Sequence, residues 1–220
     1  MPRRSPPDTS PAKPERPEGA SRPDTPSARR RGDAALAGLG NDLEQARRLL
    51  GDPAPEVRAT ALGALVRAGG VERRDVQGAL ADPDPLVRRR ACELAPRLPG
   101  ADYLPLLEDG VDAVVEAAAF ALGELRDARA TAALSSLARS HRDPLCRESA
   151  VAALGAIGDP RGLRAVLDAL GDAAAIRRRA TVALAAFDPS ATEAALRRCL
   201  EDRDWQVRQI AEDLLGREQR

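Results

Sequence analysis

The chain has 220 residues, of which 34 are Lys or Arg and 34 are Asp or Glu, so its formal net charge is zero. Residues 1–32 contain eight basic and four acidic side chains, which leaves 26 basic against 30 acidic, a net charge of −4, in residues 33–220. An acidic body argues against nucleic-acid binding, which draws its affinity from neutralising phosphates, and no apolar run approaches the roughly 18–20 residues of a membrane-spanning helix.

The first segment differs in composition from the rest of the chain. Residues 1–32 contain eight prolines and almost no aliphatic side chains, so they cannot bury enough apolar surface to offset the entropy of ordering. We predict a disordered Pro/Arg-rich tail over residues 1–32 and a folded repeat domain over residues 33–220. No apolar segment follows the basic start of the chain, so we expect no signal peptide and a cytoplasmic protein.

The folded domain repeats a short pattern about every 30 residues. The stretch DPAPEVRATALGAL at Asp52–Leu65 returns as DPDPLVRRRACELA at Asp82–Ala95. We call the first apolar residue of each such helix the anchor. It occurs six times, at intervals of 30, 27, 32, 30 and 31 residues: Val57, Val87, Val114, Cys146, Ile176 and Val207. A fixed interval of this size is typical of a solenoid.

Each unit contains two helical patterns. Positions 0, +4, +7, +8 and +11 from the anchor form one apolar stripe at the helical period, with alanine at +4 in all six units: Ala61, Ala91, Ala118, Ala150, Ala180 and Ala211. A shorter amphipathic segment precedes each stripe, and Asp-Pro turns separate the two because proline ends one helix and is tolerated in the first turn of the next. We therefore predict helix A, a tight turn and helix B in units of about 33–68, 69–98, 99–126, 127–158, 159–188 and 189–220.

These stretches, together with LGAIGDPRGLRAVLDAL and DRDWQVRQIAEDLL, resemble HEAT repeats, and most closely the short units of the phycobilisome-lyase HEAT-like branch. The resemblance covers residues 41–220. It implies an all-α, right-handed α-solenoid of about six HEAT-like helix pairs, with the partial helix DAALAGLG capping its start.

The resemblance also implies a ladder in which an Asp in the turn pairs with an Arg six residues later and links adjacent units. The matching pairs are Asp52/Arg58, Asp82/Arg88 and Asp202/Arg208. The middle units depart from this pattern. Six residues after Asp109 stands Val115 instead of an arginine, and His141 replaces the aspartate six residues before Arg147. Arg177 follows Asp172 after five residues instead of six. We expect a weaker ladder there.

Residues that carry catalysis in other proteins are scarce. His141 is the single histidine, no activated-nucleophile motif or glycine-rich phosphate loop is present, and Cys92, Cys146 and Cys199 lack CxxC spacing. We interpret the cysteines as reduced core thiols and predict no catalytic residues, no metal and no cofactor.

Three enzyme families that resemble this fold provide further tests. Deoxyhypusine hydroxylases bind two irons through His-Glu pairs. The chain has no His-Glu dipeptide, which excludes that activity. HEAT-like DNA glycosylases use aromatic side chains and an Asp in a basic groove, whereas Trp205 is the single tryptophan and is expected to cover the last repeat junction. Phycobilin lyase subunits share the repeat without a short signature, so a subunit of a tetrapyrrole-handling lyase complex is the alternative function.

The remaining question is which surface is unusual. In HEAT solenoids the B helices line the concave face, and positions +2 and +6 point away from the apolar stripe. Phe120, Ala152 and Val182 occupy position +6 in three successive units, between the charged Glu93 and Asp213. An apolar centre with charged flanks favours peptide binding, although Phe120 packed on its neighbouring helix and solvated arginines would give the same pattern.

We therefore predict a non-catalytic protein–protein interaction scaffold or adaptor that holds a segment of another protein on the helix-B face. The candidate contact residues are Arg89, Arg90, Glu93, Glu116, Phe120, Glu148, Arg178 and Val182.

Overall fold

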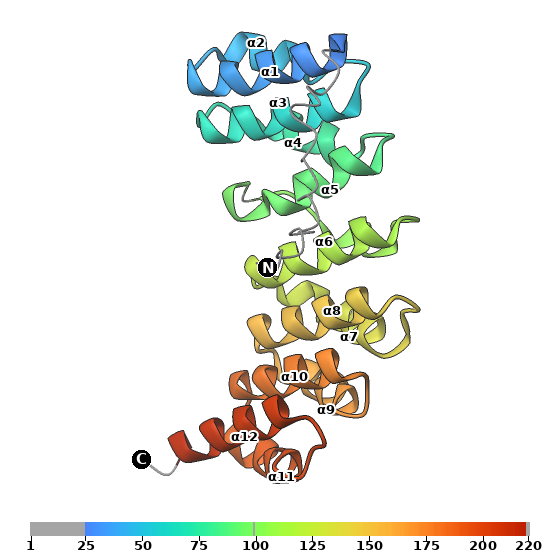
Figure 1. The fold of residues 1–220 in the computed structure, drawn as a ribbon, viewed down its shortest axis with the longest axis vertical. Helices are drawn as coiled ribbons and strands as arrows, with labels where there is room; N and C mark the ends of the chain where they lie inside the picture. The colour runs from blue at the N-terminus through green and yellow to red at the C-terminus, as the bar shows by residue number, and fades with distance from the viewer. Residues whose placement is uncertain (1–24, 99, 219–220) are drawn as a thin grey trace, which may run out of the picture.

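The structure, a computed structural model, describes residues 25–98 and 100–218, and all regular structure within these residues is helical. The helices stack into the elongated column of an α-solenoid that runs from α1 to α12 (Figure 1). The B helices are α1 (Pro26–Leu39), α3 (Pro55–Arg67), α5 (Pro85–Glu93), α6 (Asp112–Glu124), α8 (Pro144–Ile157), α10 (Ala174–Ala183) and α12 (Trp205–Glu218). The A helices are α2 (Leu43–Leu49), α4 (Arg73–Leu80), the 3₁₀ helix η2 (Leu104–Glu108), α7 (Thr131–Ser140), α9 (Leu163–Ala169) and α11 (Pro189–Cys199).

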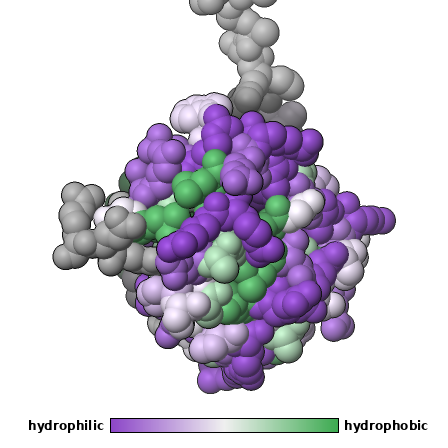
Figure 2. All heavy atoms as spheres, turned by 90° about the horizontal axis from the view of Figure 1, so that it is seen from below, coloured by the Kyte–Doolittle hydropathy of each residue, from purple (hydrophilic) through white to green (hydrophobic). Residues whose placement is uncertain are grey.

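The core lies between the two layers. All six anchors and all six alanines at position +4 are buried, which confirms the stripe, because a methyl side chain at +4 lets neighbouring helices approach closely. Proline stands in the first turn of α3, α5 and α8, where its missing N–H is not needed. Seen from the α12 end, apolar side chains cross the middle of the molecule between hydrophilic flanks (Figure 2).

The folded part begins earlier than predicted. Helix α1 starts at Pro26, seven residues before the predicted boundary at Asp33, and it is a full helix of 14 residues rather than a partial cap. Thr25 is its N-cap, with a side-chain oxygen that accepts from the N–H of Ala28 at 3.2 Å. Arg30, assigned to the tail, pairs with Asp52 at 2.6 Å. The prediction of disorder for residues 1–24 lies outside the described residues.

The third A helix is also different from the expected one. The segment DYLPLLED forms the five-residue 3₁₀ helix η2 instead of an α-helix. This helix lies within the shortest repeat interval, the 27 residues from Val87 to Val114, and Pro105 stands in its first turn. A tighter helix with a larger rise per residue spans the same layer with fewer residues.

The ladder links each arginine to the aspartate of the following unit, not to the carboxylate of its own turn. Nε and Nη2 of Arg58 donate to the two carboxylate oxygens of Asp82 at 2.8 and 2.7 Å. Nη1 of Arg58 donates to the main-chain oxygen of Asp52 at 2.9 Å, which explains the spacing of six residues. The sequence pattern therefore identified the participating residues but assigned the wrong carboxylate to each arginine.

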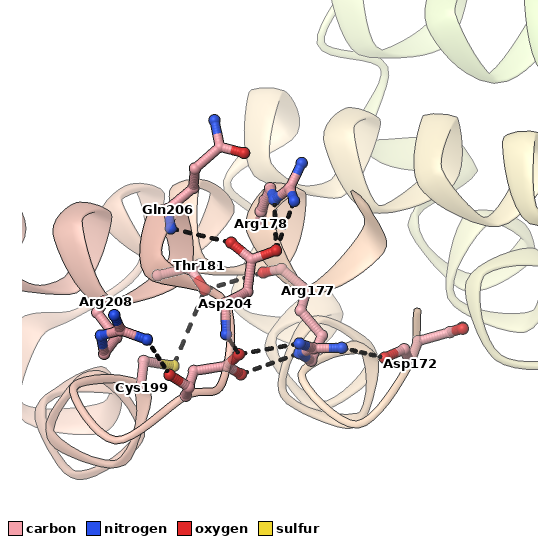
Figure 3. A network of polar contacts seen from close by, with 9 residues as sticks. Asp172, Arg177, Arg178, Thr181, Cys199, Asp204, Gln206 and Arg208 are labelled. Atoms are coloured by element: carbon pink, nitrogen blue, oxygen red, sulfur yellow. Dashed lines mark hydrogen bonds and ion pairs between the residues drawn. The ribbon is translucent and has the colours of Figure 1, made fainter. Parts of the chain in front are cut away.

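Most of the middle of the ladder is present with the same kind of pairing between successive units. The carboxylate of Asp109 pairs with Arg88 at 2.7 Å, and that of Asp172 pairs with Arg147 at 2.8 Å. Arg177 contacts the main-chain oxygen of Asp172 despite the shorter spacing and pairs with the carboxylate of Asp202; Figure 3 shows this part of the ladder.

Among the described junctions between successive B helices, the arginine–aspartate pair is replaced only between α6 and α8, where Val115 and His141 occupy the two positions. His141 keeps the local role of the missing aspartate, because its Nδ1 accepts from the N–H of Asp143 at 3.1 Å. At the end of the ladder, Nη1 of Arg208 donates to the main-chain oxygen of Asp202 at 2.7 Å.

Candidate functional site

A groove runs across the solvent-exposed face of two adjacent B helices. It has a volume of about 460 Å³ and is lined by residues of α6 and α8 together with Arg179 of α10. We call it the α6–α8 groove. Phe120 is 49% exposed and Leu145 is 61% exposed, so two large apolar side chains meet solvent at the groove. Exposed apolar side chains that gather in one concave place mark binding surfaces more often than scattered ones do.

The local helix geometry brings these side chains together. Glu116 and Phe120 are four residues apart on α6, as are Glu148 and Ala152 on α8, so each pair stands on one helix face. Small side chains line the groove between them, and Ala152 is partly exposed there.

A second, smaller depression continues the groove along the column. It has a volume of about 280 Å³ and is lined by residues of α8, α10 and α12, among them Arg178, Val182 and Ile210. Glu148 lines both depressions, which makes them neighbours on the same surface. Val182 is 49% exposed. The structure thus brings together five of the eight predicted contact residues: Glu116, Phe120, Glu148, Arg178 and Val182.

The other three predicted contact residues form a separate cluster on α5. Nε of Arg89 donates to Oε1 of Glu93 at 2.8 Å, and Nη1 of Arg90 donates to Oε2 of the same carboxylate at 3.0 Å. Arg90 also lies near Gly63 of α3, because a Cβ on Gly63 would stand 3.1 Å from Nη2 of Arg90. None of the three lines the α6–α8 groove.

Arg178 also forms an ion pair within the chain, with Asp204. Its Nε donates to Oδ2 of Asp204 at 3.0 Å, across the junction between α10 and the turn before α12 (Figure 3). This hydrogen bond lowers the pKa of Asp204 to about 2. The positive charge that the sequence pattern assigned to a partner is therefore largely matched by a carboxylate of this chain.

Among the groove residues that the sequence pattern missed are one large apolar and two charged side chains: Leu145, Glu124 and Arg179. Leu145 lines the groove from the position before its anchor. The other units carry these residues at that position: Glu56, Leu86, Ala113, Ala175 and Gln206. Glu124 and Arg179 stand at positions +10 and +3, which were not read as part of the face. Leu86 occupies the same position in the second unit, so this position by itself did not single out Leu145.

Residues that elsewhere carry chemistry have structural surroundings here. Burial raises the pKa of the Cys92 thiol to about 12 and that of Cys146 to about 11, and it also raises the pKa of Cys199. Within residues 25–98 and 100–218, no group of three or more His, Cys, Asp or Glu is placed to hold a metal ion. Trp205 is 64% exposed, so the expectation that it covers the last junction is wrong; it begins α12 and points outward.

A larger cleft lies on the A-helix side. It has a volume of about 610 Å³ and is lined by Val76 of α4, by Leu98, and by Pro105 and Leu106 of η2. Leu98 and Gly100 line this cleft, and residue 99 between them lies outside the described residues. The α6–α8 groove is described on all sides and adds charged side chains to its apolar wall, and for these reasons it is the candidate site.

Comparisons with known proteins agree with this architecture. Residues 101–185 match the family model for HEAT repeats. No curated protein matches the chain. Within the described residues, no helix is long and apolar enough to cross a membrane.

Solved structures similar to this one include engineered proteins and a designed repeat protein. One engineered protein has 21% identity and a TM-score of 0.60, with coverage of 80% of this chain and 95% of that chain. Another has 20% identity and a TM-score of 0.61, with coverage of 80% and 98%. A designed armadillo repeat protein in complex with peptide (KR)4 has 17% identity, a TM-score of 0.50, and coverage of 86% and 90%.

At these identities the likeness establishes the fold. The described part of the chain is an α-solenoid repeat protein whose central units match HEAT repeats. The family model is that of HEAT repeats in general, so the phycobilisome-lyase-like branch stays a prediction.

Proposed function

We propose that this protein is a non-catalytic scaffold or adaptor that holds a segment of another protein on the outer surface of its B helices. The observation that carries the proposal is the α6–α8 groove, where Phe120 and Leu145 remain exposed although both are large and apolar. An extended segment or a helix laid across a groove buries such side chains and gains free energy from them.

The repeat architecture supports this function. Each helix pair buries its apolar stripe on its neighbours, and stacking then builds a long surface from a short pattern. The designed armadillo repeat protein of similar fold was solved in complex with peptide (KR)4, and a peptide partner is what we propose here.

The test is a cross-linking capture experiment in cells that contain the protein. Wild type would be compared with the double variant Phe120→Ala and Leu145→Ala, which removes apolar area without adding charge. The matched control is Leu36→Ala with Leu39→Ala, two exposed leucines of α1 outside the groove.

Proteins captured by wild type and by the control, and lost from the groove variant, would support the proposal. Circular dichroism must show that all variants keep the helical content of wild type. Equal capture by wild type and groove variant would contradict the proposal.

A further inference from the structure

The glutamates of the α6–α8 groove have longer hydrogen bonds within the chain than the charged residues of the neighbouring helices α5 and α10 have. On α5, one glutamate meets two arginines, and on α10 Arg178 is matched by Asp204 at 3.0 Å. The glutamates of the groove have weaker contacts. Glu116 accepts from Oγ of Ser149 at 3.4 Å, and Glu148 accepts from Nη2 of Arg179 at 3.4 Å.

Glu124 is the third carboxylate that lines the groove, after Glu116 and Glu148. It is exposed at the groove, and no ion pair joins it to another residue of the described chain. Among the described residues, the groove therefore gathers three carboxylates against one guanidinium, that of Arg179. The distance between Arg179 and Glu148 is 3.4 Å, compared with 2.6–2.9 Å for the ion pairs of the ladder.

These carboxylates surround an apolar surface. Phe120 stands four residues after Glu116 and four before Glu124, so its half-exposed ring lies between two carboxylates on one face of α6. Leu145 and Ala152 of α8 line the same groove. A long cationic side chain suits such a place, because its methylene stem can lie on the ring while its charged end meets the carboxylates.

We propose that the α6–α8 groove binds a protein segment that presents an arginine or lysine side chain next to an apolar one. The cation forms charge-assisted hydrogen bonds with Glu116, Glu124 and Glu148, and the apolar neighbour packs against Phe120 and Leu145. This inference rests on the proposed function and adds the chemistry of the partner.

The test uses the full-length protein and a displayed library of short random peptides. Peptides are selected on wild type and counter-selected on Phe120→Ala, and their affinities are then measured by fluorescence anisotropy. The charge variant is Glu116→Gln, Glu124→Gln and Glu148→Gln, which keeps side-chain shape. The matched control carries Glu44→Gln, Glu108→Gln and Glu201→Gln, three exposed glutamates outside the groove.

We expect selected peptides to be enriched in arginine or lysine beside an apolar residue. Their affinity should fall about tenfold or more in the charge variant, since each lost charge-assisted hydrogen bond removes a sizeable share of the binding free energy. It should be unchanged in the control and should weaken as salt concentration rises.

Two other outcomes separate the inference from the proposed function. Peptides that require Phe120 but lack cationic enrichment, and that bind the charge variant as tightly as wild type, would overturn the inference and leave the docking function standing. If the counter-selection leaves no peptide that binds wild type more tightly than Phe120→Ala, both the inference and the proposed function are overturned.

Discussion

In the turn before α6, Asp109 and its partner Arg88 together join three segments of the chain. Asp109 accepts from the N–H of Val111 in its own turn at 3.0 Å and from Nε of Arg88 in the preceding unit at 2.7 Å. Arg88 in turn donates to the main-chain oxygen of Asp82 at 2.7 Å. Arginine suits this position because its planar fork can meet a carboxylate and a carbonyl at the same time.

Replacing Asp109 by Asn should therefore destabilise the protein. The substitution removes the negative charge and leaves Arg88, which is only 17% exposed, without its counter-charge. We expect the free energy of unfolding to fall by about 2 kcal/mol, measured by urea denaturation. Asp102→Asn is the matched control, because that exposed carboxylate contacts Arg129 at 3.4 Å. An equal effect of the two substitutions would show that the ladder pair contributes no special stability.

The three cysteines should be inert in the folded protein. Burial raises the pKa of Cys92 to about 12 and that of Cys146 to about 11, so the nucleophilic thiolate is scarce at about pH 8. We expect no alkylation by iodoacetamide in the native protein and complete reaction in urea, followed by mass spectrometry. Rapid labelling of native Cys92 would be inconsistent with its buried position.

At the scale of the element, glycine controls how closely successive B helices pack. A Cβ on Gly123 of α6 would lie 2.8 Å from Cα of Ala153 in α8, and one on Gly155 of α8 would lie 2.9 Å from Cα of Ala183 in α10. Both glycines stand nine positions after their anchors. Gly216 stands at the same position in α12, where a Cβ would meet nothing within 4 Å.

The two positions give a matched pair of substitutions. Gly123→Ala should lower the free energy of unfolding by about 1–3 kcal/mol, because the new methyl group meets backbone that cannot move aside. Gly216→Ala should leave stability unchanged or raise it by up to about 1 kcal/mol, through helix propensity alone. Thermal or urea unfolding measures both. A stabilising effect of Gly123→Ala would mean that α6 and α8 can separate at little cost.

The junction between α6 and α8 offers a test of the ladder as a device of the repeat. Val115→Arg alone places an unpaired charge at a buried position and should destabilise the fold. Combining it with His141→Asp recreates the pair of the other junctions. A double-mutant cycle should give a favourable coupling energy of about 1 kcal/mol or more. Additive single effects would show that this junction cannot accept the pair.

For the whole molecule, the ladder makes stability depend on acid pH. Hydrogen bonds from the ladder arginines lower the pKa of four carboxylates: Asp52, Asp109, Asp172 and Asp202. A carboxylate with a lower pKa in the folded than in the unfolded chain stabilises the fold fully above the unfolded pKa of about 3.9. That contribution is lost as the pH falls through the lower, folded value.

The melting temperature should therefore stay nearly constant from about pH 7 to about pH 5 and fall steeply below about pH 4. Calorimetry across this range measures the slope. The Asp109→Asn variant should show a shallower acid slope than wild type, because one of the shifted carboxylates is gone. An identical slope would mean that Asp109 does not contribute to the acid dependence.

The sequence by itself determined the helix pairs, the buried anchors and the alanines at position +4, because helical periodicity is local and reads directly from residue spacing. It also identified Phe120 and Val182 as apolar residues on a polar face. Tertiary structure decided which residues of different units meet. It placed Asp82 against Arg58, matched Arg178 with Asp204, and joined Leu145 to Phe120 in one groove. Such pairings depend on the offset between stacked helices, which no single repeat encodes.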